Sequence, residues 1–411
     1  MTVRYRWSIR AQTPFHIASS RSLAASTETL PYIPGTALRG AVAAAFLAAH
    51  SDASPIFHRL TEETRFGHAY PTLPSGAGSS PLPLSAVTCR QAPGFRADAG
   101  HGVDDLLLAA EASALTQPED QSLPAPNDVG ELITCAICAD DRQRQPGAAT
   151  VQWRGWYAWD AAVPRHACVR LGMQVEGRAG GALDHQRALT TRQTVQTEQR
   201  FVGSVAFPDQ ETAALVDDLL TRQENRLWVG AGRSRGLGEL LVTRQEQAAP
   251  EEAATLGARQ EGLADRLAHL CSRVGARLPE GPTYGALTLQ AMALLPDAFG
   301  RWQRTCSADM LSDWLGLPSS ALEVRQSFQD SQWLGGWNAA LHMPKADALG
   351  LAAGSCWLFR VDGVERDEVV AALQRLEDSG IGERRQEGFG MVRACDSLHW
   401  QVHELGQERT A

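Results

Sequence analysis

The chain has 411 residues, a length that allows two or three domains at about 100–200 residues per domain. Hydrophobic residues make up 44% and charged residues 21%, so we expect a packed globular protein without long disordered regions. No apolar run approaches the ~20 residues of a membrane span and the N-terminus lacks the apolar core of a signal peptide, so we expect a cytoplasmic protein. Eight cysteines are too few for a disulfide scaffold, although some of them could bind a metal.

The net charge of −9 alone argues against a nucleic-acid-binding protein. However, residues 97–141 contain ten acidic residues and no lysine or arginine. Without those ten acids the chain has 38 basic and 37 acidic residues, so patches of arginine can exist elsewhere. Lys345 is the only lysine.

The first elements of the chain are predicted to be a strand and a helix. Residues 3–10 alternate between apolar and polar side chains, which is typical of a half-buried strand. In the segment 30–40 (LPYIPGTALRG), Pro34 and Gly35 end an extended stretch and Thr36 is predicted to cap a helix that runs to His50. The predicted buried face of this helix carries Leu38, Val42 and Phe46, with Arg39 at its edge.

Residues 71–148 have a different composition, with clusters of proline, glycine and serine and the acidic stretch, and we interpret them as an insertion in the first domain. Strands are predicted at 151–159 and 166–173. Trp153, Trp156 and Trp159 alternate on the first of these strands and could stack on bases, but we favour packing in the core. A helix is predicted from Asp209, followed by a glycine-rich loop that leads into another strand.

A second domain is predicted after a polar stretch rich in alanine and glutamate. It begins with a strand at 284 and ends with a helix over 368–379, which Gly380 terminates. The predicted organisation is therefore a first domain (1–245) with an acidic insertion (71–148), a linker (246–262) and a second domain (263–411).

Two glycine-rich loops resemble each other, which indicates an internal repeat. Residues 230–238 (GAGRSRGLG) and 380–390 (GIGERRQEGFG) both read G-x-G-x-x-R followed by a glycine pair. Neither fits a dinucleotide-binding loop, because the spacing and the order of elements differ. The glycines could serve only to form a tight turn, but the arginines favour phosphate recognition, so we predict contact with an RNA backbone. The predicted RNA-contacting residues are Arg39, Gly230, Gly232, Arg233, Arg235, Gly236, Gly238, Gly380, Gly382, Arg384, Arg385, Gly388 and Gly390.

The phrase YIPGTALRG at 32–40 resembles the helix-start motif of the RAMP superfamily, the RNA-binding subunits of CRISPR effector complexes. Residues 230–238 resemble the glycine-rich loop of that superfamily, and residues 380–390 are similar to the C-terminal signature of the type III-D Csx-ten subunits, which are related to Cas-five. The resemblance implies an α+β fold of two tandem ferredoxin-like (βαββαβ) domains. It also implies a cytoplasmic antiviral complex in which this subunit binds the 5′ tag of the guide RNA (crRNA). The implied partners are crRNA, a Cas-ten-like large subunit, Cas-seven-like backbone subunits and, indirectly, target RNA.

Cys89, His101, Cys135 and Cys138 form a candidate set of four zinc ligands within the insertion. The insertion is poor in apolar residues, so a structural zinc ion would hold it together, and we expect it to lie away from the RNA, facing solvent or a neighbouring subunit. The alternatives are ordinary buried thiols, or a redox Cys-x-x-Cys motif that lacks its usual βαβ setting.

The sequence favours a protein without catalytic activity. Several histidines could act as the general base of an RNase, but the sequence shows no pairing between them. These candidates are His16, His58, His68, His166 and His185. The Cas-seven-like subunits carry a catalytic aspartate before the helix-start motif. In this chain the corresponding residues, 15–31, contain no aspartate, and Glu28 is their only carboxylate. The alternatives left open are a Cas-seven-like subunit that cleaves target RNA with a carboxylate and a divalent metal, and a protein-interaction module that does not contact RNA.

Overall fold

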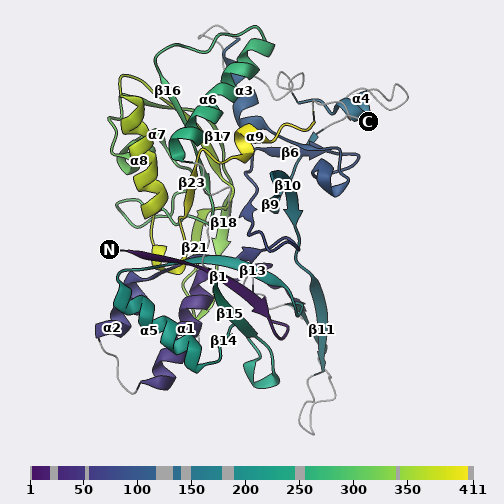
Figure 1. Ribbon diagram of the computed structural model, residues 1–411, viewed down its shortest axis with the longest axis vertical. Coiled ribbons are helices and arrows are strands. Elements are labelled where there is room, and N and C mark those ends of the chain that lie inside the picture. The colour runs from purple at the N-terminus through teal and green to yellow at the C-terminus, as the bar shows by residue number, and fades with distance from the viewer. Residues whose placement is uncertain are drawn as a thin grey trace.

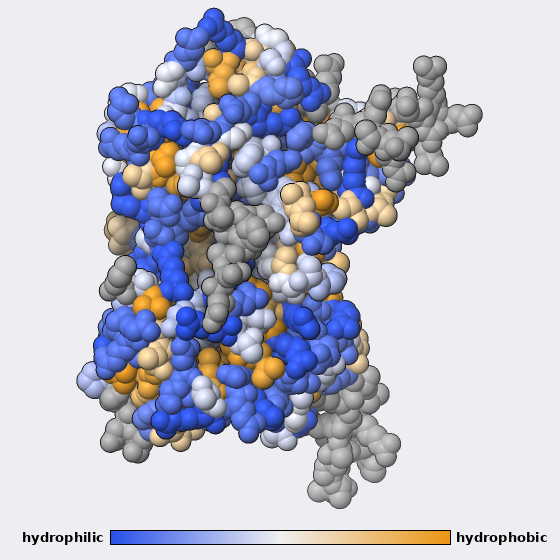
Figure 2. All heavy atoms as spheres, in the orientation of Figure 1, coloured by the Kyte–Doolittle hydropathy of each residue, from blue (hydrophilic) through white to orange (hydrophobic). Residues whose placement is uncertain are grey.

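The computed structural model describes residues 2–18, 26–50, 55–116, 133–139, 150–177, 189–245, 255–338 and 343–405. As the sequence predicts, helices are combined with antiparallel sheets in an α+β fold. The two main sheets belong to the N-terminal and C-terminal halves, which lie at the bottom and top of Figure 1. Most of the face in Figure 2 is hydrophilic, with small scattered apolar patches. Among the described helices, none combines the length and the apolar character needed to cross a bilayer.

The N-terminal half forms one sheet in the strand order β14-β15-β1-β13-β3, with β4 also paired to β13. Helices α1 and α5 pack on one face of this sheet, and the C-terminal half lies on the side of its other face (Figure 1). Along the chain the elements are β1 (Val3–Ala11), α1 (Gly35–Ala49), α2 (Pro55–His58), β3 (Arg65–Phe66), β4 (Tyr70–Pro71), β13 (Arg200–Phe207), α5 (Gln210–Arg222), β14 (Arg226–Trp228) and β15 (Glu239–Gln245).

The C-terminal half repeats this plan with the strand order β17-β22-β16-β23. In both halves the first strand is central and lies between two antiparallel neighbours, which are β13 and β15 for β1, and β22 and β23 for β16. The elements are β16 (Thr283–Leu289), α7 (Ala308–Leu315), β17 (Leu322–Phe328), β22 (Cys356–Val361), α8 (Arg366–Ser379) and β23 (Val392–Ala394). The C-terminal half therefore reads strand-helix-strand-strand-helix-strand. The N-terminal half follows the same order with α2, β4 and β14 as additional elements, and each half has its own buried core.

The predicted strand and helix at the start of the chain are confirmed. In β1, Tyr5, Trp7 and Ile9 are buried, while the polar residues that alternate with them lie on the opposite face. Helix α1 buries Leu38, Val42 and Phe46, as the spacing predicts. The predicted cap is wrong: Pro34 precedes the helix without a side-chain cap, and the backbone N–H of Gly35 donates to Nδ1 of buried His68 instead.

The described part of the predicted insertion packs on the C-terminal half. Its elements are β6 (Ala86–Cys89), β7 (Val103–Asp105), α3 (Leu106–Ala114) and α4 (Ala136–Ala139). Their apolar side chains join the C-terminal core beside α6 (Leu256–Arg273), which begins within the stretch predicted as a linker. The expectation that only a metal would hold this segment is therefore wrong, because apolar burial also holds it.

The expectation that the acidic stretch faces solvent is also wrong for three of its members, Asp104, Asp105 and Glu111, which are buried. Asp105 caps α3 by accepting from the Leu107 N–H at 3.0 Å and also contacts the buried His399 ring. Glu111 accepts from Arg325 Nε at 2.8 Å. Burial is tolerated because each of these two carboxylates has polar partners. The acids at 119, 120, 128, 131, 140 and 141 lie outside the described residues.

The tryptophans fall on a broken strand rather than on a continuous one. Strand β8 ends at Gln152, and β9 begins at Trp156 after Gly155, whose φ is 143°. Trp153 packs against Phe95 and His166, which is the packing interpretation of the sequence.

The remaining strands form small sheets. Strand β8 (Thr150–Gln152) pairs with β6. Two three-stranded sheets consist of β5 (Ser80–Pro81), β9 (Trp156–Asp160) and β10 (Val163–Ala167), and of β2 (Ser26–Thr27), β11 (Leu171–Gly177) and β12 (Leu189–Val195). Two strand pairs are β18 (Ser331–Leu334) with β21 (Ala348–Leu351) and β19 (Trp337–Asn338) with β20 (Met343–Pro344), and a short helix, α9 (Leu398–Gln401), lies near the end of the described chain.

The start of α1 generates a prediction about two glycines of the same helix. A Cβ on Gly35 would lie 1.8 Å from the carbonyl oxygen of Phe66, whereas a Cβ on Gly40 would meet no atom within 4 Å among the described residues. We expect Gly35→Ala to destabilise the fold by about 1–3 kcal/mol through this overlap. Gly40→Ala is the matched control and should stabilise it by roughly 0.5–1 kcal/mol through helix propensity. Chemical denaturation measures both, and equal effects of the two substitutions would contradict the prediction.

Candidate functional site

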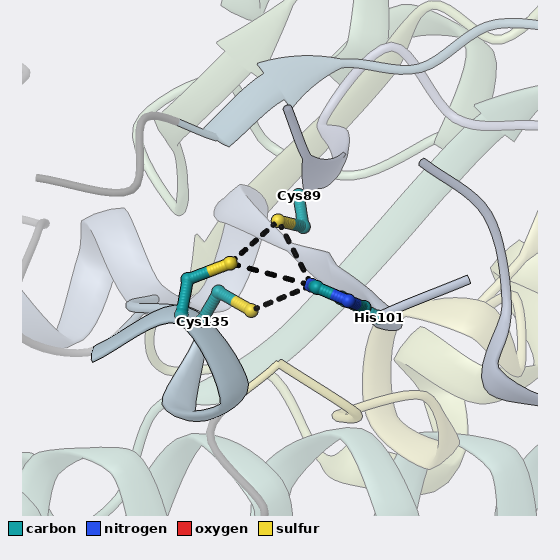
Figure 3. Close-up of side chains that lie close together, drawn as sticks. Cys89, His101 and Cys135 are labelled. Carbon is teal, nitrogen blue, oxygen red and sulfur yellow. Dashed lines mark hydrogen bonds between the residues drawn. The ribbon is translucent and has the colours of Figure 1, made fainter. Parts of the chain in front are cut away.

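The four predicted metal ligands converge on one point of the insertion. Cys89 ends β6, and His101 lies in the loop before β7. Cys135 directly precedes the single turn of α4, and Cys138 lies within this turn. Their ligand atoms all lie within 4.8 Å of one another. Figure 3 shows the side chains of Cys89, His101 and Cys135 pointing toward one another from these separate segments.

The spacing of these atoms matches a tetrahedral zinc site. Nδ1 of His101 lies 3.4 Å from Cys89 Sγ, 3.3 Å from Cys138 Sγ and 3.7 Å from Cys135 Sγ. Cys89 Sγ and Cys138 Sγ are 3.6 Å apart. Ligand atoms around a tetrahedral zinc lie roughly 3.5–3.8 Å apart, given Zn–S and Zn–N bonds of about 2.3 and 2.0–2.1 Å. The group could therefore hold one zinc ion with all four coordination positions filled by protein.

The electrostatics of the cluster favour a bound cation. Burial and the neighbouring sulfurs raise the pKa of Cys138 to about 12, and burial is the largest cause of the raised pKa of Cys135. Burial also acts on Cys89, but its pKa is lowered overall because the backbone N–H groups of Ala92 and Gln91 donate to its sulfur. Three thiolates repel one another at this distance, and a divalent cation would remove that repulsion.

We call the four candidate ligands, Cys89, His101, Cys135 and Cys138, the metal cluster. This cluster contacts the C-terminal end of the described chain. The Ala136 N–H donates to the carbonyl oxygen of Leu405 at 2.8 Å. The Glu404 carboxylate accepts from the Val103 N–H at 3.0 Å, close to His101 in sequence. A metal bound here would therefore fix three segments of the insertion and the strand of chain that leaves α9.

The two glycine-rich loops have the same conformation, but not in the register predicted from the sequence. Gly230 corresponds to Gly382, because the residue after each glycine makes an equivalent backbone hydrogen bond. The N–H after Gly230 donates to the carbonyl oxygen of His16, and the N–H after Gly382 donates to that of Leu294. Each loop then forms a single 3-10 turn, Arg233–Arg235 or Arg385–Glu387, between two left-handed residues. The structure therefore aligns Arg233 with Arg385, and Arg235 with Glu387. The predicted alignment of Arg235 with Arg385 is wrong, because the matching of glycines ignored Arg384, which takes the left-handed position of Gly232 with φ 56°.

The setting of the first loop also differs from the prediction. It connects β14 to β15 as a hairpin, whereas the second loop directly follows α8. The glycines at the ends of both loops approach backbone: a Cβ would lie 2.1 Å from the Val229 oxygen at Gly238 and 1.8 Å from the Ile381 oxygen at Gly390. These glycines are needed for the turn itself, whatever the loops bind.

The outer side of the second loop is covered by the N-terminal half. A Cβ on Gly388 would lie 2.5 Å from the Phe66 oxygen and 2.7 Å from Nδ1 of His68. Burial lowers the pKa of His68 to about 4, so its ring is neutral near pH 7 and serves to accept from Gly35 rather than to act as a general base.

Glu387 is the centre of an ion-pair cluster in the same place. Its carboxylate lies 2.6 Å from Arg384 Nη2, 3.3 Å from Lys345 Nζ and 3.7 Å from Arg39 Nη1. Burial raises the pKa of Glu387, but the three cations outweigh burial and lower it overall. Arg39 also pairs with Glu62 at 2.6 Å. Two of the predicted RNA-contacting residues, Arg39 and Arg384, are thus engaged inside the protein.

The outer side of the first loop is open. Arg233, Ser234, Arg235 and Gly236 are exposed, and a Cβ on Gly236 would meet no atom within 4 Å among the described residues. Within the described part of the chain, the Arg233 guanidinium has no ion-pair partner. A third arginine is close, because Arg192 Nη1 lies 3.4 Å from the Cβ position of Gly232.

The remaining candidate residues are scattered. His16 contacts the carbonyl oxygen of Gln193 at 2.8 Å, His166 stacks on Trp153, and Glu28 is exposed in its loop. His185 lies outside the described residues. Sequence reasoning missed Glu387 and Lys345; that Lys345 is the only lysine was visible, but only folding places it beside Glu387.

No protein-family model matches the chain, and no curated protein matches it. The chain is similar to a chain of the type III-B Cmr-beta complex bound to cognate target RNA and AMPPnP, with 11% identity, a TM-score of 0.40, and coverage of 92% of this chain and 90% of that one. It is also similar to a CRISPR-associated protein Cas6, with 9% identity, a TM-score of 0.29, and coverage of 96% and 99%. Similarity to Cmr4 covers 60% of this chain and 100% of that one, with 12% identity and a TM-score of 0.25. At TM-scores below 0.5 these likenesses do not establish how the chain works.

The metal cluster generates a prediction about composition. Full-length protein should contain about one zinc per chain by elemental analysis, because the four ligands form one tetrahedral set. Replacing Cys135 and Cys138 with serine should abolish zinc binding. Cys168→Ser is the matched control, since Cys168 is exposed and outside the cluster, and it should leave the zinc content unchanged. Zinc-free wild-type protein, or equal zinc in all three, would contradict the assignment.

The Glu387 cluster generates a prediction about pH. Because the folded pKa lies below the usual value of about 4.3, the ionised carboxylate stabilises the fold above that pH, and this stabilisation is lost as the pH falls through the folded pKa. Glu387→Gln should lower the free energy of unfolding by about 1–3 kcal/mol at neutral pH. The difference from wild type should shrink toward pH 3.

The matched control for this substitution is Glu280→Gln, which removes an exposed ion pair with Arg277. It should change stability little at any pH. A Glu387→Gln protein that is as stable as wild type at neutral pH would contradict the role of the cluster.

Proposed function

We propose that the chain is a non-catalytic, RNA-binding structural subunit of a type III-D CRISPR effector complex. In this role it binds the 5′ tag of the guide RNA and helps to assemble the complex. The observation that carries the proposal is the first loop, in which Arg233, Arg235 and Gly236 are exposed and Gly232 lies beside Arg192.

The chemistry of the first loop suits a phosphate backbone. Arginine offers a planar set of donors that can bind a phosphate through two hydrogen bonds. Gly236 has φ 76°, and none of the residues that the structure describes has an atom within 4 Å of its Cβ position, so a ligand can approach the loop backbone closely. Contacts of this kind position an RNA strand without reading its sequence, which fits a subunit that must accept any guide.

The topology supports a tandem ferredoxin-like architecture for this subunit. The C-terminal half reads strand-helix-strand-strand-helix-strand, the N-terminal half follows this order with additional elements, and the central first strand lies between two antiparallel strands in each. Both halves also end in the same glycine-rich loop and strand. Two such units in one chain are what the resemblance to the RAMP superfamily implies.

A structural rather than catalytic role is supported by the metal cluster. Three cysteines and one histidine would fill the tetrahedral coordination of zinc and leave no position for an activated water molecule. The assignment to type III-D, and the partners that go with it, rest on the similarity of residues 380–390 to the C-terminal signature of that group, beside the resemblance of residues 32–40 to the helix-start motif of the RAMP superfamily. The proposed partners are crRNA, a Cas-ten-like large subunit and Cas-seven-like backbone subunits.

The proposal is tested with full-length protein and a labelled single-stranded RNA. Replacing both Arg233 and Arg235 with glutamine should weaken binding by about tenfold or more, because each charge-assisted contact contributes ~1.5–3 kcal/mol. Arg277→Gln is the matched control, an exposed arginine on the opposite half of the chain, and should bind RNA like wild type. Unchanged binding by the folded double variant would contradict the proposal, as would a wild-type protein that binds no RNA.

A further inference from the structure

Three arginines from distant parts of the chain meet at the C-terminal turn of α8. Arg4 lies on β1, Arg65 on β3, and Arg385 in the second glycine-rich loop. In Figure 1 the lower end of α8 and the yellow segment after it lie beside the N-terminal strand. We call Arg4, Arg65 and Arg385 the arginine cluster.

The register of the N-terminal sheet places two of these arginines on one face. Arg4 and Arg65 both pair with Ala206 of β13, one from each side. Their sequence neighbours Tyr5 and Phe66 are buried against the helices, so both arginines project from the opposite, open face. That face is the one directed toward the C-terminal half.

The contacts of the arginine cluster are few. Arg4 Nη1 lies 2.8 Å from the Asp378 carboxylate. Arg65 Nη1 donates to the carbonyl oxygens of Asp378 and Ser379 at 3.1 and 2.9 Å. Arg385 Nη1 donates to the Ser379 oxygen at 3.3 Å. In each guanidinium, Nε and Nη2 make no hydrogen bond with any described residue.

The charges of the cluster are not balanced. Among the described residues, Arg4 is the one member of the cluster with an ion pair, to the Asp378 carboxylate, and the side chains of Arg4 and Asp378 are 57% and 46% exposed. Burial, followed by the charges of Arg385 and Arg4, lowers the pKa of Arg65. The carbonyls at the end of α8 attract cations. Three guanidinium groups gathered there also repel one another, and an anion bound between them would relieve this repulsion.

We propose that the arginine cluster binds phosphates of the RNA strand, as a second contact separate from the first glycine-rich loop. The proposal rests on the proposed function, because it names a further part of the same RNA's path. The free Nε and Nη2 groups supply the planar pairs of donors that a phosphate accepts. The structural repeat supports this assignment, since Arg385 occupies the position that Arg233 holds in the first loop.

The place of the cluster agrees with a path for an extended strand. Arg4 and Asp378 also line a groove of 740 Å³ between the two halves. Arg6 and Ser204, from the open face of the N-terminal sheet, line the same groove. An RNA strand that contacts the cluster would thus run along the edge of this groove, where polar side chains of both halves are within reach.

The test compares the salt dependence of RNA binding between variants of the full-length protein. The substitutions Arg4→Gln, Arg65→Gln and Arg385→Gln are combined, and Arg222→Gln is the control, an exposed arginine with an ion pair elsewhere. Each lost phosphate contact should lower the slope of log K against log salt by about 0.7. We expect the triple variant to bind more weakly with a slope reduced by about 2, while the control keeps the wild-type slope.

The outcomes separate this proposal from the one on which it rests. If the triple variant keeps the wild-type slope and affinity while the Arg233/Arg235 variant loses binding, the arginine cluster is only a helix cap and the present proposal is overturned alone. If wild type binds no RNA, both are overturned. Equal binding of polyglutamate would show a general anion patch and would also overturn it.

Thermal unfolding guards against loss of the fold as the cause of weaker binding. Should the triple variant unfold, Arg385→Gln alone is measured, because Arg385 is exposed and its side chain makes one hydrogen bond. This single variant should lower the slope by about 0.7, and an unchanged slope overturns the proposal.

Discussion

The close approach of three backbone segments, at Gly35, at Phe66 to His68 and at Gly388, is the constraint on which the rest of the structure depends. The carbonyl oxygen of Phe66 lies so near to Gly35 and Gly388 that a Cβ on either residue would overlap it. The first helix of one half, a short strand of the same half and the last loop of the other half are therefore locked together without side chains between them. The ion pairs of Glu387 surround this contact. The contact also fixes how the N-terminal sheet is oriented toward α8, and this orientation brings Arg4, Arg65 and Arg385 together.

The structural repeat shows one loop put to two uses. In the C-terminal half the outer side of the loop is covered by α1 and β3, and its position equivalent to Arg235 is an acid, Glu387, that pairs with cations inside the protein. In the N-terminal half the same side is open, and arginines occupy the 3-10 turn at both ends. The turn geometry is shared because the backbone hydrogen bonds correspond and three of the four glycines do, while Arg384 adopts the left-handed conformation of Gly232. What differs is the surface that each loop meets: in the second loop Glu387 is buried against the N-terminal half while Arg385 stays exposed, whereas in the first loop both arginines of the turn are exposed.

Local patterns in the sequence predicted those helices and strands in which apolar side chains recur at a regular spacing over several residues. The alternation of β1 and the apolar spacing of α1 were sufficient, and cysteine and histidine chemistry was specific enough to bring together Cys89, His101, Cys135 and Cys138. Other features depend on contacts between distant segments. Strand β3 has two residues and hence no period, so Arg65 could not be placed on a face. The acids Asp105 and Glu111 look solvent-exposed by composition and are buried because a helix N-terminus and Arg325 receive them. The register of the repeat was obscured because an arginine adopts the left-handed conformation that glycine usually takes.

The ion-pair cluster around Glu387 contains Lys345, the only lysine of the chain. Reagents that acylate primary amines therefore have a single side-chain target in this protein, besides the terminal amino group. That target lies 3.0 Å from Thr36 Oγ1, at the contact between the two halves, and its side chain is 29% exposed. A fluorophore or a crosslinker attached there would report on the junction itself, without any engineered cysteine. Because all other basic residues except histidine are arginines, the one lysine side chain that can be labelled selectively lies at the contact between the two halves.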